Sequence, residues 1–294
     1  MSRADEIYKA TCLDILNNGL SDENLEVRPR WEDGTPAHTF FVTHNMRQYH
    51  LDKGEFPICT LRPIAWKSAI KEILWIYQKK SNSLEVLRNE YGIKYWDEWE
   101  SKNYPNTIGK TYGYIVDRYD LFNKRVLNSI KENPYSRYHV CSMWQEEVFN
   151  EPDFDGLKPC CYETIWTVRG EYLDMLLNQR SGDMLTASGA GNVNEVQYAT
   201  LLLMVAKATG YKPGKFTHIV ANEQIYDRHI DQAIELTIRG EKLKSDAPYY
   251  KYQYDDVRME FNPKSDNFYD FTIDDFKLIG YNPIKPQLNL ELGI

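Results

Sequence analysis

Apolar residues recur at helical spacing in four stretches of the chain, and this period predicts four main helices. The stretches are residues 2–19, about 64–77, about 195–208 and 227–238. Ser2 is followed by acidic residues and is a candidate N-cap for the first helix. Gly19, Gly210 and Gly240 stand where three of the helices should end, because glycine readily adopts the conformation that closes a helix.

The strand signals are shorter. Residues 162–180 are rich in β-formers on both sides of Arg169-Gly170, which predicts a hairpin, and the β-branched run 216–221 predicts a buried strand. Residues 26–41 are predicted to be a loop that leads into a strand, and residues 243–268 to be mostly loop. Because no linker or repeat interrupts the chain, we predict a single domain of mixed helix and sheet over residues 1–294.

Composition narrows the functional classes. The chain has 294 residues, 42% of them hydrophobic, and 35 Lys and Arg against 43 Asp and Glu give a formal net charge of −8. A sizeable core is expected and broad affinity for DNA or RNA is not, although an acidic protein can still bind a small anion locally. The five cysteines lack metal or redox spacing, and no apolar run suits a leader peptide or a membrane span. We therefore expect a cytoplasmic protein with reduced thiols and no bound metal.

Two segments could carry chemistry on an anionic substrate. Cys160 follows Pro159 just before the predicted hairpin, and a thiol becomes a good nucleophile where positive charge favours the thiolate. Taken alone, such a cysteine is more often a small buried apolar residue. In the segment Gln179–Asp183, the guanidinium of Arg180 and the hydroxyl of Ser181 suit a phosphate, whereas the more common interpretation is a solvated turn.

A third candidate is Glu72 in the second predicted helix. It shares one face with Ala65, Ala69 and Ile76, so the carboxyl is either desolvated, with a raised pKa suited to proton transfer, or on an edge that faces water. The pattern does not choose between the two. His229 lies beside apolar residues and is predicted to be a satisfied core histidine.

Together these motifs resemble the thymidylate synthase family. The most specific stretch is L-K-P-C-C at residues 157–161 followed by Q-R-S-G-D at residues 179–183, with Gln179 placed 19 residues after Cys160. The other landmarks, in the family's order, are Arg28, Pro57–Arg62, Glu72–Trp75, Tyr95–Trp99, Gly109–Gly113, Asn194–Tyr198 and Gln224–His229. The resemblance implies an α+β layered fold in which a mixed β-sheet is packed by helices and two such sheets meet at a homodimer interface.

The resemblance also implies a reaction, the reductive methylation of dUMP to dTMP by 5,10-methylenetetrahydrofolate, which leaves dihydrofolate. Cys160 would attack uracil C6, and Arg180 would hold the phosphate and favour the thiolate. Glu72 would manage protons through ordered water, and Tyr112 would help to order that network. A hydroxymethylase on the same fold, in which water captures the methylene group, is the nearest alternative. A non-catalytic nucleotide-binding relative is a more distant one.

The binding residues are implied position by position. The amide of Asn194 would read the O4 and N3–H edge of uracil, for which cytosine has the reverse polarity. The other implied contacts to the nucleotide come from Arg28, Gln179, Arg180, Ser181, Gln224, Tyr226 and, across the dimer interface, Arg137. The implied folate contacts are Arg62, Trp96, Trp99, Asp183 and the C-terminal tail that ends at Ile294.

Four departures from the family pattern are visible. Cys161 stands where many members have histidine, Tyr138 where a second arginine is common, and Gln224 where histidine is usual. The segment 184–193 is longer than usual, so the uracil-reading amide could be aligned to Asn192. We prefer Asn194, because E-V-Q-Y-A follows it as in the family's buried helix.

Overall fold

The computed structural model describes residues 2–240 and 257–294, and its centre is a mixed seven-stranded sheet. The strand order is β1-β2-β7-β5-β4-β3, with β6 also paired to β7. Because β7 runs parallel to β5 and β6 but antiparallel to β2, the predicted mixed sheet is confirmed. The strands are β1 (Leu20–Ser21), β2 (Thr39–His50), β3 (Val140–Ser142), β4 (Cys161–Arg169), β5 (Tyr172–Gln179), β6 (Gly182–Asp183) and β7 (Lys212–Tyr226).

The predicted hairpin is confirmed, and the predicted strand at 216–221 is too short. β4 and β5 pair as antiparallel neighbours, and Gly170 turns between them with a φ of 63°, a conformation that suits glycine. β7 extends to Lys212–Tyr226 because it pairs with β2 on one side and with β5 on the other. Those partners come from distant parts of the sequence, so local composition did not indicate the full length.

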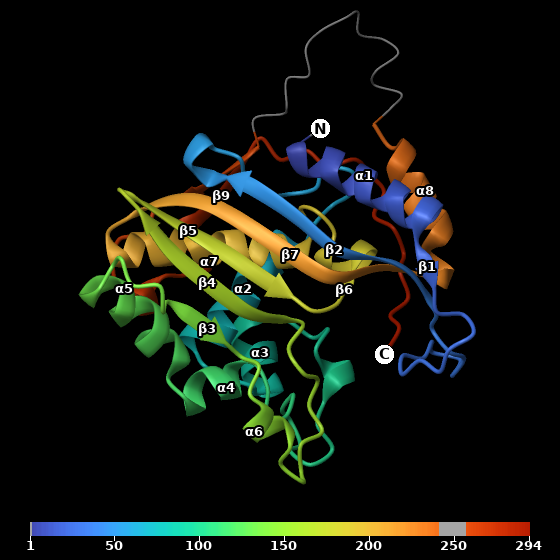
Figure 1. The fold of residues 1–294 in the computed structure, drawn as a ribbon, viewed down its shortest axis with the longest axis horizontal. Coiled ribbons are helices and arrows are strands. Elements are labelled where there is room, and N and C mark those ends of the chain that lie inside the picture. Colours follow the sequence, from blue (N-terminus) through green and yellow to red (C-terminus); the bar gives the residue numbers. More distant parts are fainter. Residues whose placement is uncertain (1, 241–256) are drawn as a thin grey trace, which may run out of the picture.

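One face of the sheet is covered by α7 and, beyond it, α2 (Figure 1). α7 (Val193–Thr209) is buried on almost every side and ends at Gly210 in the left-handed conformation, as predicted. α2 (Trp66–Ile73) packs on α7 and continues as the π-helix η2 (Leu74–Gln78), so the helix predicted at 64–77 has a change of hydrogen-bond pattern in its second half. These two helices carry Asn194 and Glu72 toward the same end of the sheet.

Two further predicted helices lie at the β2 end of the sheet. α1 (Arg3–Asn18) begins at Ser2, whose hydroxyl and backbone form a capping box with Asp5, and its C-cap is Gly19. The region 227–238 begins as a 3-10 turn, η6 (Asp227–His229), before it becomes α8 (Ile230–Ile238). Both predicted helices are therefore present, the last one with a tighter first turn.

The remaining elements surround this framework. The short helices α3 (Leu84–Tyr91), α4 (Gly113–Arg118), α5 (Asn128–Glu132) and α6 (Glu146–Phe149) gather below the sheet (Figure 1). The 3-10 and π turns are η1 (Leu51–Lys53), η3 (Asp97–Trp99), η4 (Asn123–Leu127), η5 (Met184–Ser188), η8 (Phe268–Asp270) and η9 (Ile273–Asp275). β8 (Arg258–Phe261) pairs with β9 (Phe276–Ile279), so the loop predicted for 243–268 is wrong over these four residues, because the strand depends on a partner far along the chain. Residues 243–256 of that predicted loop lie outside the described residues.

The other face of the sheet has no helix over it among the described residues (Figure 1). Apolar side chains line it in register: Ile165 is paired with Leu176, and Met46 with Ile219. Met46 is 69% exposed, and the other three are half-buried. This apolar sheet face, formed by Met46, Ile165, Leu176 and Ile219, is called the outer face below.

Candidate active site

Cys160 lies immediately before β4 and is held by two neighbours. Its backbone N–H donates to the hydroxyl of Tyr112 at 3.1 Å, and its carbonyl accepts from the backbone N–H of Arg180 at 3.0 Å. The Arg180 side chain also donates to the carbonyls of Pro159 at 3.1 Å and Lys158 at 2.8 Å. The hairpin therefore sets Cys160 and Arg180 side by side, as the two sequence motifs suggested.

The two adjacent thiols have different surroundings. Cys160 is half-buried, whereas Cys161 is 4% exposed and its Sγ donates to Oε1 of Gln179 at 3.3 Å. Burial raises the pKa of the Cys160 thiol above its ordinary value, and the charges of Arg180 and Arg28 oppose that effect. Burial also raises the pKa of Cys161, well above the usual value. Of the pair, Cys160 is thus the more accessible thiol and the one beside two cations.

Tyr112 occupies a strained position at the start of α4. Its φ is 45° and its ψ is −109°, outside the comfortable regions for a bulky residue. The next residue must be glycine, because a Cβ on Gly113 would lie 2.0 Å from the carbonyl oxygen of Ser81. The Tyr112 ring packs edge-on against Trp96 with 5.4 Å between centroids. The strain thus presents the tyrosine hydroxyl to Cys160.

Glu72 is buried, which decides the choice that the sequence left open. It is 6% exposed, and the hydroxyl of Tyr95 donates a short hydrogen bond to its Oε2. Burial raises the pKa of the carboxyl, although the bond from Tyr95 opposes the rise. Trp96 and Trp99 pack edge-on nearby, with 5.5 Å between their centroids. A buried carboxyl with a raised pKa is suited to general acid-base work.

The amides of Gln179 and Asn194 meet between β5 and α7. Gln179 is 3% exposed, and its Nε2 donates to the carbonyl of Ser181 at 2.9 Å and to Oδ1 of Asn194 at 3.2 Å. Asn194 is half-buried, and its Nδ2 donates to Oε1 of Gln197 at 3.0 Å. Each Asn194 atom keeps bonding capacity, since an amide oxygen has two lone pairs and an amide nitrogen two hydrogens.

Asn192 is placed very differently. It is 0% exposed, its Nδ2 donates to the carbonyl of Met184 at 2.9 Å, and its Oδ1 accepts from Nη2 of Arg62 at 3.0 Å. Its amide is thus occupied in holding the 184–193 segment. Between the two asparagines, the structure favours Asn194 as the one available to a ligand.

The end of β7 brings further predicted residues to the same site. β6 pairs with β7 so that Asp183 lies opposite Gln224. Burial raises the pKa of Tyr226 to about 12, the Asp183 carboxylate adds to the rise, and the charge of Arg28 opposes it. Arg28 is exposed and acts on both Tyr226 and Cys160, so its charge lies within electrostatic reach of the Cys160 thiol. The half-buried Ser181 completes this group beside Arg180.

Three predicted residues are held elsewhere or otherwise engaged. Arg62 is 6% exposed, and its Nη2 donates to Leu185 and Asn192, whereas its buried Nε has no hydrogen-bond partner among the described residues. The carboxylate of Asp183 accepts from the N–H of Leu185 at 3.0 Å and from Oγ1 of Thr186 at 2.5 Å. Ile294 exchanges two backbone hydrogen bonds with Arg30, at 2.9 and 2.7 Å. The C-terminal tail therefore lies along the loop that contains Arg28 and Arg30.

Arg137 is not part of this site within one chain. It is exposed and lines a shallow pocket of about 200 Å³ together with Ile165–Val168 of β4. A strand rises about 3.4 Å per residue, so that part of β4 is roughly 17 Å or more from Cys160. This separation exceeds the reach of an arginine side chain.

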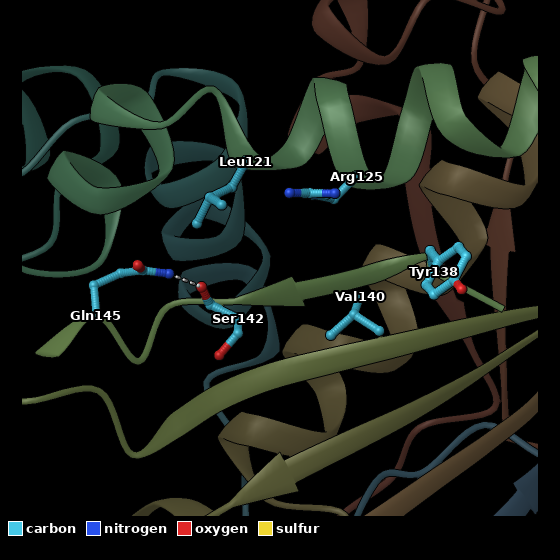
Figure 2. Close-up of a pocket in the computed structure, with 6 residues that line it drawn as sticks. All are labelled: Leu121, Arg125, Tyr138, Val140, Ser142 and Gln145. Carbon is cyan, nitrogen blue, oxygen red and sulfur yellow. Dashed lines mark hydrogen bonds between the residues drawn. The ribbon is translucent and has the colours of Figure 1, made fainter.

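A second shallow pocket, of about 340 Å³, lies beside Arg137 at the edge strand β3. Figure 2 shows Arg125 and Leu121 projecting over it from the helix above, with Val140 and Ser142 of β3 beneath. Tyr138, the departure from the family's second arginine, lines its open end and is 80% exposed. Arg125 therefore lines the same pocket as Tyr138, the position at which a second arginine is common in the family.

Sequence reasoning missed a buried ionic cluster behind the site. Arg47 donates from Nε to Glu195 at 2.5 Å and from Nη1 to Glu223 at 2.8 Å, and His218 bonds Glu195 and Gln179. All four charged or titratable residues are 5% exposed or less. Each one looks like an ordinary polar residue in sequence, and only the β2–β7 register and the first turn of α7 unite them.

His229 is buried as predicted but is not satisfied. It is 1% exposed and packs edge-on against Trp31 and Tyr226, with centroids 5.5 and 5.9 Å away. Neither ring nitrogen has a hydrogen-bond partner within the described residues. The prediction was right about burial and wrong about partners, because aromatic rings surround the imidazole.

Two absences concern the described residues alone. None of the described helices has the length and hydropathy to cross a bilayer. No cluster of three or more His, Cys, Asp or Glu side chains suited to a metal ion occurs in residues 2–240 and 257–294.

Comparisons with known proteins agree with this geometry. The family model described as thymidylate synthase matches residues 6–294. Curated thymidylate synthases from Streptococcus pneumoniae (strain 70585) and Streptococcus sanguinis (strain SK36) are each 44% identical to the chain over 299 residues, which is the full length of both partners. The solved structure of thermostable thymidylate synthase A from Bacillus subtilis superimposes with a TM-score of 0.81 at 34% identity and 99% coverage of each chain. The chain therefore belongs to the thymidylate synthase family.

Proposed function

We propose that Cys160 is the nucleophile of an enzyme that methylates dUMP to dTMP. Family membership makes the chain a methyltransferase of this reaction, with 5,10-methylenetetrahydrofolate as co-substrate. The single observation that carries the assignment of Cys160 is its position: a half-buried thiol beside Arg180 and within the field of Arg28. Such a site can bind an anion and present sulfur to it at the same time.

The electronic step follows from these groups. The Cys160 thiol passes its proton to water as sulfur bonds to C6 of the pyrimidine, and the C5–C6 π electron pair moves toward O4, which makes C5 nucleophilic. Because burial raises the pKa of this thiol, it is mostly protonated at rest, and the positive charge of Arg180 lowers the energy of the thiolate when it forms. The Nδ2 of Asn194 suits O4, and its Oδ1 suits N3–H.

Different residues are candidates for binding the phosphate and the ribose of the nucleotide. Arg180 keeps Nη1 for the phosphate after its other two nitrogens bind carbonyls, and Arg28 adds a second charge. Ser181 supplies a hydroxyl next to Arg180, and Gln179 acts through Asn194. Gln224 and Tyr226 suit the ribose hydroxyl, with the Gln224 amide in place of the imidazole usual in the family.

Other residues are candidates for proton transfer and for binding of the folate. Glu72 is the candidate for moving protons through water, because its pKa is raised and its carboxyl lies near the Trp96 ring. The co-substrate supplies the one-carbon unit and the hydride when it binds. Its flat ring would fit the aromatic wall of Trp96 and Trp99. The remaining candidates for folate contacts are Asp183, Arg62 and Ile294, which bond to Leu185, Asn192 and Arg30 in this structure.

We propose that the protein works as a homodimer of single-domain subunits. Arg137 cannot reach Cys160 of its own chain, and the outer face is an apolar surface that none of the described helices covers, which suits a second copy of the chain. The partner subunit would bring its own Arg137 to the phosphate. The free, unpaired cysteines agree with a reducing compartment such as the cytoplasm.

Covalent trapping tests the nucleophile. 5-Fluoro-dUMP with methylenetetrahydrofolate should attach to the peptide that contains Cys160, and peptide fragmentation should place the adduct on Cys160 and not on Cys161. Cys160→Ser should lose turnover and trapping, whereas Cys161→Ser is the matched control that keeps both. An adduct on Cys161, or near wild-type turnover by C160S, would show that the assignment is wrong.

Subunit mixing tests the dimer. Arg137→Ala and Cys160→Ser are each expected to be inactive or nearly so, but half of the dimers in a random mixture carry one intact site. Activity should therefore return to roughly one quarter of the wild-type value after the subunits exchange. No recovery in a mixture that has demonstrably exchanged would contradict a shared site.

A further inference from the structure

A continuous hydrogen-bonded path runs from the buried ionic cluster to the amide of Asn194. His218 Nε2 lies 2.9 Å from Gln179 Oε1, and Gln179 Nε2 lies 3.2 Å from Asn194 Oδ1. His218 is 0% exposed and Gln179 is 3% exposed, so water does not compete for these bonds. The path connects β7, β5 and α7.

The donor and the acceptor of each hydrogen bond between His218, Gln179 and Asn194 follow from which atoms carry hydrogen. The carbonyl of Ser181 can only accept, so the Gln179 atom 2.9 Å from it must be the Nε2 donor. Gln179 Oε1 then faces His218, and because this oxygen can only accept, His218 Nε2 must carry a hydrogen. Gln179 Nε2 in turn donates to Asn194 Oδ1, which leaves Asn194 Nδ2 directed at Gln197.

His218 is itself held by charged neighbours. Its Nδ1 lies 3.0 Å from Oε1 of Glu195, and Arg47 donates to the same carboxylate at 2.5 Å. Burial alone would raise the pKa of Glu195, but the charge of Arg47 and the bond to His218 lower it to about 2. The carboxylate is therefore ionised at neutral pH, and both ring nitrogens of His218 face acceptors, which fixes the orientation of the imidazole. Burial lowers the pKa of His218, and the bond to Glu195 opposes that effect.

We propose that His218 is a positioning residue that makes the site select uracil over cytosine nucleotides. The inference rests on the proposed role of Asn194. Uracil offers an N3–H donor and an O4 acceptor, whereas cytosine offers an N3 acceptor and an amino donor. An Asn194 amide rotated by half a turn would match cytosine, and the His218–Gln179 path opposes that rotation because it supplies a donor to Oδ1.

Binding of dUMP and dCMP to purified variants tests this role. His218→Phe fills a similar space without an N–H, so only the Ser181 carbonyl and the Cys161 thiol still orient Gln179. The dUMP:dCMP affinity ratio should therefore fall about tenfold, the effect of one buried hydrogen bond. His218→Gln retains a donor and should keep most of the ratio. Gln179→Glu replaces the donor with a carboxylate oxygen that accepts from Asn194 Nδ2, so it should move the ratio further toward dCMP.

The controls separate positioning from general damage. His139 is also 0% exposed, but it bonds Ser129 and Pro134 and has no link to Asn194, so His139→Phe should lower stability and leave the ratio unchanged. An unchanged ratio in both H218F and Q179E overturns the proposal, and Q179E alone decides if H218F does not fold. If the wild-type protein binds dUMP well and Asn194→Ala does not weaken that binding, the role of Asn194 fails instead.

Discussion

The hydroxyl of Tyr112 accepts a hydrogen bond of 3.1 Å from the backbone N–H of Cys160, although the two residues are 48 positions apart in sequence. Tyr112 has a positive φ at the start of α4, and Cys160 directly precedes β4. A strained turn in one part of the fold thus holds the backbone at Cys160, the proposed nucleophile, in another. Strain of this kind persists only where the surrounding structure enforces it.

Tyr112→Phe should therefore impair catalysis more than folding. The substitution leaves the ring on Trp96 but removes the acceptor for the Cys160 N–H, so we expect kcat to fall about tenfold while stability falls by about 1 kcal/mol. Steady-state kinetics and urea unfolding measure the two effects. Tyr119→Phe is the matched control, because the Tyr119 hydroxyl is buried without a hydrogen-bond partner among the described residues. Equal kinetics for the two variants would contradict the role of Tyr112.

Arg28→Ala should make Cys160 less reactive toward iodoacetamide at neutral pH. Burial raises the pKa of the thiol and Arg28 opposes the rise, so loss of this cation should raise the pKa further and shift the pH profile of labelling to higher pH. A fall of several-fold in the labelling rate at pH 7 is expected from a shift of about half a unit. Arg3→Ala, in which the lost cation pairs with Glu55, is the control. A labelling profile that shifts to lower pH in R28A would contradict the proposed effect of the Arg28 charge on Cys160.

Glu195 should give the protein a distinctive acid sensitivity. Its folded pKa of about 2 lies below the unfolded value of about 4.3, so its stabilisation is present above pH 4.3 and is lost as the pH falls toward 2. The wild type should lose about 3 kcal/mol across this window on account of this group. Glu195→Gln should be less stable at pH 7 but lose less on acidification.

Urea unfolding at pH 6, 4 and 3, at one protein concentration, measures this difference. The control is Glu171→Gln, which removes an exposed carboxylate paired with Lys212 and should keep the wild-type slope. Parallel stability curves for E195Q and the wild type would show that the charge of Glu195 is not the source of the acid sensitivity.

Arg228 should help to hold the C-terminal tail in place. Its guanidinium donates to Asp33 at 2.6 Å and to Glu291 at 3.1 Å, which links the loop after Arg28 to the tail. Because these are exposed ion pairs, Arg228→Ala should raise the KM for the folate about threefold and leave thermal stability nearly unchanged. Arg118→Ala, which removes two comparable pairs with Glu147 and Glu151, should not change that KM. An equal rise of the KM for the folate in R118A would show that the effect comes from the loss of any surface ion pair and not from the C-terminal tail.

The elements with a clear local period were predictable. α7 follows from its long apolar stretch and from Gly210, and the β4–β5 hairpin follows from its β-formers and from Gly170. The strand β8 was missed because its four residues are recognisable only beside β9. Periodicity placed Glu72 on a stripe but could not say which side of α2 packs against the core.

The site was predictable where its residues are neighbours in sequence, and otherwise not. Cys160 and Arg180 belong to motifs that a hairpin brings together. Arg47, Glu195 and His218 carry no such signal, because charged residues are usually exposed and these three become one cluster only in the folded chain. The sequence likewise named Arg62 but could not show that Leu185 and Asn192 engage it.

Arg180 serves two roles with one side chain. Two of its nitrogens hold the carbonyls of the residues just before Cys160, and the third remains for an anion. Because the bonds to these carbonyls form within the chain itself, Arg180 is already oriented before an anion arrives. A phosphate would therefore meet a guanidinium that loses little conformational freedom on binding, and a nucleoside would gain nothing from this arrangement.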